Sequence, residues 1–169
     1  MKIVIGLLAL LAALVAAMYL LGRRLPREHS ASKSVRVSAT PAAIFGALVD
    51  VDAFPRWRPE VRSVEKLGEI AGKRRYRETS GHGALTFEVA EEAPGARLVT
   101  VIVDEGQPFG GRWTFDLRPA EGLTQVTITE DGFVDPPIFR FLTHHVFGQT
   151  ATMETYLKNL VRRFETTSK

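Results

Sequence analysis

The chain contains no cysteine. This absence excludes a disulfide framework, a thiolate nucleophile and a cysteine-based zinc site. The sequence also holds no Ser-His-Asp arrangement, no glycine-rich phosphate-binding loop and no dinucleotide fingerprint. The enzyme classes that depend on those motifs are therefore excluded, and we expect neither a metal nor a cofactor.

An excess of charge of one sign is missing from most of the chain. The net charge of +3 comes from the first 30 residues, where Lys2, Arg23, Arg24 and Arg27 stand against Glu28. Residues 31–169 hold equal numbers of basic and acidic side chains. A nucleic-acid-binding domain is expected to carry a basic field, so we expect no nucleic-acid partner.

One short basic cluster interrupts this balance, and acidic residues flank it. We interpret it as the solvated, charged face of a strand. The cluster consists of Lys73, Arg74, Arg75 and Arg77, with Glu69 and Glu78 beside it.

One long apolar run is present, from Ile3 to Gly22, and it contains no charged side chain. Twenty helical residues span ~30 Å, the thickness of a bilayer's hydrocarbon core. We therefore predict a single-pass membrane anchor over residues 1–24. The alternative is a signal peptide that is cleaved after the small residues at 15–17, but the apolar run continues past that cleavage site. The arginines after the run place the following domain in the cytoplasm, with the extracytoplasmic face as the alternative.

The remaining residues divide into a polar linker at 25–33 and one domain at 34–169. A first strand is predicted at 34–39, and Thr40-Pro41 marks the start of a short helix. A second short helix or turn follows around Phe54. Alternating apolar residues and turn signals then predict six strands. These strands are expected at 61–68, 73–79, 84–91, 97–104, 111–118 and 123–130.

Asp135-Pro136 repeats the helix-start signal, and a helical pattern runs from there to about Glu165. Gly148 interrupts the pattern, as a kink or a short break. The expected fold is therefore α+β. About seven antiparallel strands form a curved sheet around a long C-terminal helix, with two short helices after the first strand. A concave, mostly apolar cavity is expected between sheet and helix.

The order of elements and three local motifs resemble the START-like, or SRPBCC, superfamily. Residues 35–45 resemble its opening strand and helix, and residues 54–59 (Phe-Pro-Arg-Trp-Arg-Pro) resemble its second helical segment. Residues 111–132 resemble its last two strands. The resemblance implies a helix-grip fold. It also implies binding of hydrophobic molecules such as lipids, sterols, quinones or plant hormones, or cyclisation of polyketides, which one fold can host in different members.

Catalysis requires a proton-transferring group within reach of a partner, and histidine is the first candidate. His29 falls in the predicted linker and is discounted, whereas His82 is expected at an exposed turn. His144 and His145 lie early in the C-terminal helix, where at most one can face the cavity. They cannot chelate a metal from adjacent positions. Glu130 is expected to face inward, either toward a ligand or in an ion pair with Arg112 or Arg140.

Large aromatic side chains gather around the expected cavity. Roughly half should fill the core, and the others, especially Trp113 and Phe115 opposite Phe141 and His145, should line a ligand pocket. The predicted ligand-binding residues are Trp57, Tyr76, Phe87, Trp113, Phe115, Phe133, Phe141 and His145.

Three functional hypotheses follow. The leading one is membrane-tethered, non-covalent binding of a hydrophobic small molecule such as a lipid, quinone or polyketide-like compound. The second is a cyclase or aromatase that uses His144 or His145 with Glu130 as acid and base. The third is a non-ligand interaction module with a closed core. The absence of a recognisable catalytic motif favours binding over catalysis.

Overall fold

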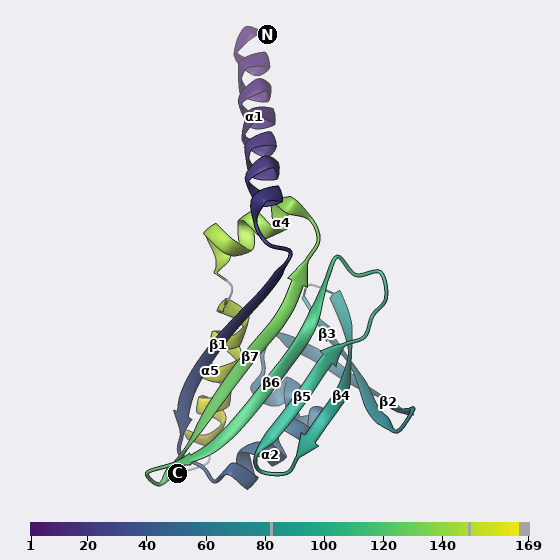
Figure 1. The fold of residues 1–169 in the computed structure, drawn as a ribbon, viewed down its shortest axis with the longest axis vertical. Coiled ribbons are helices and arrows are strands. Elements are labelled where there is room, and N and C mark those ends of the chain that lie inside the picture. The colour runs from purple at the N-terminus through teal and green to yellow at the C-terminus, as the bar shows by residue number, and fades with distance from the viewer. Residues whose placement is uncertain (82, 149, 166–169) are drawn as a thin grey trace.

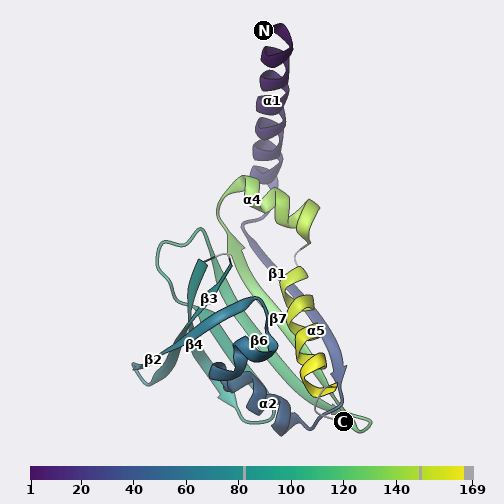
Figure 2. The same ribbon diagram turned by 180° about the vertical axis from the view of Figure 1, so that it is seen from behind.

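A curved antiparallel sheet with a helix across its concave face dominates the computed structural model, which describes residues 1–81, 83–148 and 150–165 (Figure 1; Figure 2). In that part of the chain seven strands pair in the order β1-β7-β6-β5-β4-β3-β2. The strands are β1 (Glu28–Val37), β2 (Val61–Ile70), β3 (Lys73–Ser80), β4 (Gly83–Ala93), β5 (Arg97–Ile102), β6 (Phe109–Ala120) and β7 (Leu123–Val134). The predicted α+β helix-grip class is confirmed.

Tight turns connect neighbouring strands in two of the hairpins of the sheet. Ala71 and Gly72 have φ values of 52° and 75° between β2 and β3, and Glu121 and Gly122 have 47° and 81° between β6 and β7. Two consecutive residues with positive φ match the twist of a two-residue hairpin, and glycine accepts this backbone readily. Both turn predictions are confirmed.

The first strand begins earlier than predicted, so the prediction of a linker at 25–33 is wrong from residue 28 onward. β1 pairs with β7 from Glu28 to Val37, and only Leu25 to Arg27 separate it from the preceding helix. On its outer face Ser30, Ser32 and Ser34 form side-chain hydrogen bonds with Asp131, Thr129 and Thr127 at 2.7, 2.9 and 2.8 Å. Serine alternates with other residues along this strand, and this polar period of two lacks the apolar alternation that marks the other strands.

Short helices close one end of the sheet. Thr40 caps α2 (Pro41–Val49), since its Oγ1 accepts a hydrogen bond from the Ala43 N–H at 3.2 Å. The one-turn helices η1 (Val51–Ala53) and α3 (Phe54–Trp57) follow, so the predicted pair of short helical segments is confirmed. The apolar side chains of α2 and α3, including Ile44, Leu48, Phe54 and Trp57, are buried in the core.

The predicted C-terminal helix is divided into two segments, and Gly148 marks the break, one of the two alternatives expected there. The first consists of α4 (Pro137–Leu142) and η2 (Thr143–Phe147), and α5 (Ala151–Glu165) follows. Gly148 has φ 78° and ψ 141°, a backbone conformation that ends the helix and that glycine adopts readily. Met153, Tyr156, Leu157 and Leu160 on α5 pack into the core, so the predicted apolar stripe holds for that segment alone.

The start of α4 also differs from the prediction. Pro136 occupies the N-cap and no side chain caps the helix. Asp135, the expected cap, forms an ion pair with Arg27 at the start of β1. The carboxylate of Asp135 thus connects the residues between β7 and α4 to the residue before β1, and it does not cap α4.

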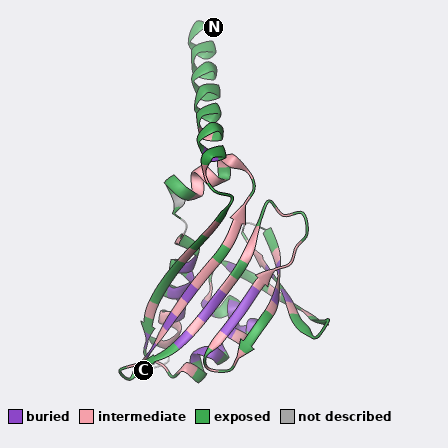
Figure 3. Ribbon diagram, viewed as in Figure 1, coloured by how far each residue is buried: buried purple, intermediate pink, exposed green. Residues whose placement is uncertain are grey.

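The N-terminal apolar run forms α1 (Lys2–Arg24), which projects away from the sheet (Figure 1). Its large side chains are exposed, as the green helix in Figure 3 shows. Among the described helices, it is the one long and apolar enough to cross a membrane.

Candidate functional site

The space between the sheet and α5 is filled by aromatic side chains. Trp57, Trp113 and Phe115 surround Tyr156 of α5, with ring centroids 5.4, 5.7 and 5.3 Å away from it. Phe54 contacts Tyr76, which stacks on Phe87 at 5.4 Å. The middle of the expected cavity is therefore core.

This packing changes the interpretation of several predicted ligand-binding residues. Trp57 and Phe115 are buried core residues, and Phe87 and Trp113 pack against that core. The expected partners of Trp113 and Phe115, Phe141 and His145, lie instead on the separate α4–η2 segment, where their rings contact each other at 4.8 Å. The helix break at Gly148 is the reason, because it separates that segment from α5.

A buried ion pair lies beside the aromatic core. Arg58 donates hydrogen bonds from both terminal nitrogens to the Glu78 carboxylate, at 2.8 and 3.0 Å. Its guanidinium also stacks over the rings of Phe54 and Tyr156. Burial raises the pKa of the Tyr156 hydroxyl despite the opposing effect of Arg58, so this phenol stays protonated at neutral pH. We assign the pair a structural role.

A pocket of about 310 Å³ opens at the end of the domain next to α1, and we call it the upper pocket. Its volume lies at the lower end of the range for small-molecule sites. Strands β1, β6 and β7, the α4–η2 segment and the start of α5 contribute to its walls. The lining residues are His29, Pro108, Phe109, Gly110, Glu130, Phe133, Val134, Pro136, Phe139, Thr143, Gly148 and Thr152.

His29 and Glu130 bring two titratable groups to the upper pocket. The His29 Nε2 and Glu130 Oε1 atoms lie 3.5 Å apart, and both side chains are mostly buried. β1 positions them by its register with β7, in which His29 lies opposite Gly132 and Ala31 lies opposite Glu130. An imidazole beside a carboxylate can donate or accept a hydrogen bond and can transfer a proton.

Gly132 and Gly110 leave space for two of the side chains that line this pocket. A Cβ atom at Gly132 would lie 3.0 Å from Cε1 and 3.2 Å from Nε2 of His29. A Cβ atom at Gly110 would lie 2.8 Å from Cε1 of Phe133. The positions of the imidazole and of the Phe133 ring therefore depend on the absence of side chains at Gly132 and Gly110.

The structure brings a histidine to the upper pocket that the sequence did not single out. His144 and His145 are exposed on η2 and do not line the upper pocket, whereas the discounted His29 does. Glu130 faces inward as predicted, but its charged neighbour is His29 and not an arginine. Arg140 donates to the backbone oxygens of Leu25 and Asp135, and Arg112 is exposed.

The serine alternation of β1 was the signal that could have placed His29 in the sheet. The predicted exposure of His82 lies outside the described residues.

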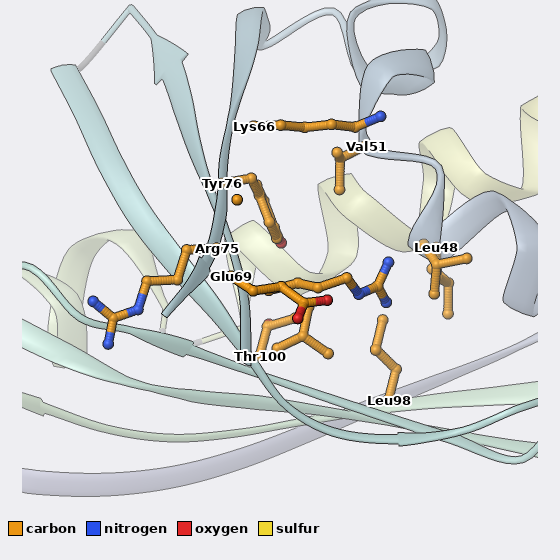
Figure 4. A pocket seen from close by; sticks show the side chains of 12 residues that line it. Leu48, Val51, Lys66, Glu69, Arg75, Tyr76, Leu98 and Thr100 are labelled. Atoms are coloured by element: carbon orange, nitrogen blue, oxygen red, sulfur yellow. The ribbon is translucent and has the colours of Figure 1, made fainter. Parts of the chain in front are cut away.

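A second pocket, of about 300 Å³, lies between α2 and strands β2 to β5, and we call it the lower pocket (Figure 4). Leu48, Val51, Leu98 and Tyr76 supply apolar surface, with charged side chains around them. Lys66 pairs with Asp52, Arg74 with Glu92 and Arg75 with Glu88. Because these cations already have carboxylate partners, the upper pocket is the better candidate for ligand recognition.

The same ion pairs explain the basic cluster of β3. Lys73 and Arg75 share Glu88, at 3.0 and 2.7 Å, and Arg77 lies 4.0 Å from Glu65. Both cations lower the pKa of Glu88 through hydrogen bonds. Lys73, Arg75 and Arg77 form the predicted charged face of β3, whereas Arg74 lies on the opposite face with Tyr76. Among the described residues, no group of three or more His, Asp or Glu side chains is placed to hold a metal ion.

Comparison with known proteins matches the domain to one family and one fold. The sequence model of the family described as polyketide cyclase / dehydrase and lipid transport matches residues 28–165. No curated protein sequence gives a significant match.

Solved structures share the fold at low identity. A START superfamily protein from Mycobacterium smegmatis is 23% identical over 83% of this chain and 99% of its own, with a TM-score of 0.66. The Zhui aromatase/cyclase from a Streptomyces species is 16% identical over 82% of this chain and 94% of its own, with a TM-score of 0.68. A protein from Thermus thermophilus is 19% identical over 83% of this chain and 100% of its own, with a TM-score of 0.67.

Proposed function

The chain belongs to the polyketide cyclase / dehydrase and lipid transport family, and from that premise we propose that it binds a hydrophobic small molecule in the upper pocket while α1 tethers it to a membrane. The single observation that carries the proposal is the His29–Glu130 pair inside a largely apolar pocket at the α1 end of the domain. Apolar burial supplies the affinity, and the polar pair selects and orients the ligand.

The pocket favours a ligand with an apolar body and one hydroxyl or carbonyl group. Phe109, Phe133 and Phe139 offer ring surface, while His29 and Glu130 lie among them. A hydroxyl can donate to the Glu130 carboxylate, and a carbonyl can accept from the imidazole. Hydrogen bonds to charged groups are stronger than those between neutral groups, so this pair sets selectivity.

The anchor fits such a ligand. Hydrophobic molecules partition into bilayers, so a tether places the pocket where its ligand is most concentrated. The positive-inside rule, applied to Arg23, Arg24 and Arg27, favours the cytoplasmic side for the domain. Protease protection in sealed, right-side-out and inverted vesicles tests that orientation.

Native mass spectrometry of the full chain, extracted in mild detergent, tests the binding. We expect a co-purifying hydrophobic molecule, or uptake of 2-naphthol in preference to its hydroxyl-free counterpart 2-methylnaphthalene. Thr152→Trp fills the pocket from α5 and should abolish uptake. Thr155→Trp, on the same helix but outside the pocket lining, should retain it. Wild-type protein that carries nothing and takes up neither probe would overturn the proposal.

The polar pair has its own test. Glu130→Leu and His29→Leu should each reduce the preference for 2-naphthol over 2-methylnaphthalene by about tenfold, which is the effect of one hydrogen bond to a charged group. If each variant lost affinity equally for both probes, the substitution would have collapsed the pocket, and the pair would have no role in selectivity.

A second candidate function is acid–base catalysis of the cyclase type, because a histidine and a carboxylate reach one pocket. His29 would remove a proton from the carbon next to a ketone and Glu130 would orient the imidazole. Exchange of the methyl protons of 2-acetylnaphthalene with D₂O, followed by NMR, tests this step. Wild-type protein should accelerate exchange and His29→Ala should not. An exchange rate equal to that in buffer would exclude this function for His29.

A further inference from the structure

The α4–η2 segment (Pro137–Phe147) is fixed to the foot of α1. A Cβ atom at Gly22 would lie 1.8 Å from the carbonyl oxygen of Pro137, so the two backbones touch. Arg140 donates from Nη1 to the Leu25 carbonyl at 3.0 Å and from Nη2 to the Asp135 carbonyl at 3.3 Å. Both ribbon views show the segment extending sideways from the base of α1 (Figure 1; Figure 2). If α1 crosses a bilayer, the segment lies at the level of its surface.

Exposed apolar side chains concentrate at this end of the domain. Outside residues 1–24, the large apolar residues exposed in the described part of the chain are Ile70, Phe109, Phe139 and Val146. Phe139 and Val146 are 58% and 61% exposed on the α4–η2 segment, and Phe109 lies across the upper pocket from it. A soluble surface exposes such side chains singly, whereas a cluster indicates a contact surface.

The α1 helix continues this apolar surface. An open groove runs along α1, and Ile138 of α4 forms its lower side. It is lined by Leu8, Leu11, Ala12, Val15, Ala16, Tyr19 and Ile138. An acyl chain can fill an apolar groove of this kind. The groove therefore joins the lipid-facing side of α1 to the first turn of α4.

The charge at this level suits a phospholipid surface. Arg23 and Arg24 are exposed in the last turn of α1, and Arg23 also stacks over Tyr19. Arginines near an anionic bilayer surface attract lipid headgroups. An apolar segment beside arginines is the arrangement of a helix that lies in the interface.

The same segment is a wall of the upper pocket, since Phe139 and Thr143 line it. We propose that the α4–η2 segment lies in the interface of a phospholipid bilayer and forms the bilayer-facing side of the upper pocket, so that a hydrophobic ligand passes between bilayer and pocket without crossing water. The inference rests on the proposed function, because it requires α1 to span a bilayer and the pocket to hold a ligand.

Spin labelling tests the position of the segment, and the absence of native cysteines makes single-site labelling direct. Val146→Cys on η2 and Ile70→Cys at the end of β2 are exposed positions, and neither lines a pocket described above. We would label each in the full chain in nanodiscs of phosphatidylcholine and phosphatidylglycerol. Collision rates with oxygen and with a water-soluble nickel chelate are then measured by power saturation.

The label at residue 146 should collide mainly with oxygen, which dissolves in the bilayer, and the label at residue 70 mainly with the nickel chelate. Nickel-dominated collisions at both positions would overturn the proposal. A label at residue 146 that is shielded from both reagents would mean that a protein surface covers the segment, which also overturns it.

The ligand path is tested by the rate of 2-naphthol uptake from nanodiscs, with empty nanodiscs subtracted. Val146→Glu should slow uptake about tenfold, because a charge opposes insertion of the segment, while Ile70→Glu should not. Binding in detergent should be unchanged for both variants. Unchanged uptake by Val146→Glu would overturn the direct path. Loss of binding by the wild-type chain in detergent would instead overturn the proposed function, so the two failures are distinguishable.

Discussion

Two single residues, Glu78 and Gly132, illustrate how one side chain affects stability and another affects the pocket. Arg58 and Glu78 are almost fully buried, with side chains 12% and 10% exposed. Removing one charge from such a pair leaves the other buried without a partner, whereas removing both is tolerated better. Gly132 contributes through the side chain that it lacks, since that space holds the imidazole of His29.

Glu78→Leu should lower the free energy of unfolding by about 3 kcal/mol, the low end of the range for a broken buried pair, because Arg58 then keeps only the more exposed Glu60, 3.1 Å from its Nε, as a carboxylate partner. Arg58→Met combined with Glu78→Leu should be less destabilised than Glu78→Leu alone. Urea unfolding of the full chain in mild detergent, followed by tryptophan fluorescence, measures both. A single variant as stable as the wild type would contradict the assigned role of the pair.

Gly132→Ala should displace the imidazole of His29 and weaken binding of 2-naphthol while the fold is retained. Gly46→Ala is the matched control, because a Cβ atom there meets nothing within 4 Å. In helix α2 that control should raise stability by about 0.5–1 kcal/mol. Equal 2-naphthol affinity in the two variants would argue against His29 as a ligand contact.

At the scale of elements, α1 and α4 meet backbone to backbone at Gly22 and Pro137. Gly22 is the one residue of α1 that is buried, and Pro137 lies directly on it. Arg140 adds two hydrogen bonds to backbone oxygens on either side of the joint. The orientation of the α4–η2 segment, and with it one wall of the upper pocket, depends on this contact.

Gly22→Ala should separate α4 from α1, since the Pro137 carbonyl cannot accommodate a methyl group at 1.8 Å without moving. Residues 137–147 should then exchange their amide hydrogens faster, as measured by mass spectrometry of the full chain. Gly6→Ala, where a Cβ atom meets nothing within 4 Å, should leave exchange unchanged. Unaltered exchange in Gly22→Ala would show that the joint does not hold the segment.

At the scale of the whole molecule, contacts distant in sequence close the domain. β1 pairs with β7, and Lys33 on β1 forms an ion pair with Glu154 on α5 at 2.8 Å. Hydrogen bonds from Lys33 and Thr150 lower the pKa of the Glu154 carboxyl. A carboxyl whose pKa is lowered by folding stabilises the folded state above its unfolded pKa of 4.5, and this stabilisation is lost as the pH falls through the lowered value.

Glu154→Gln should therefore melt at a lower temperature than the wild type at pH 7, and the difference should shrink as the pH falls below 4.5 and through the lowered pKa of Glu154. Glu165→Gln, at the exposed end of α5, is the control. Melting curves of the full chain at pH 3, 5 and 7 provide the measurement. A difference as large at pH 3 as at pH 7 would show that the effect is not electrostatic.

Much of the molecule follows from local sequence. The apolar run of α1, the glycine turns, the Thr40 cap and the alternation of Trp113, Phe115 and Leu117 depend on short-range physics and are visible along the chain. The presence of Glu130 on the inner face of β7 follows from the same alternation. The resemblance of three motifs to a known superfamily added the helix-grip class.

Tertiary structure decided which residues meet. His29 joins Glu130 only because β1 pairs with β7, which lies far along the sequence. Tyr156 fills the expected cavity because it projects from α5 among the rings of three distant residues. Gly148 separates Phe141 and His145 from that core. Periodicity reports which face a side chain occupies, but a pocket depends on long-range pairing, ring packing and the absence of side chains at Gly110 and Gly132, and these exist only in the folded chain.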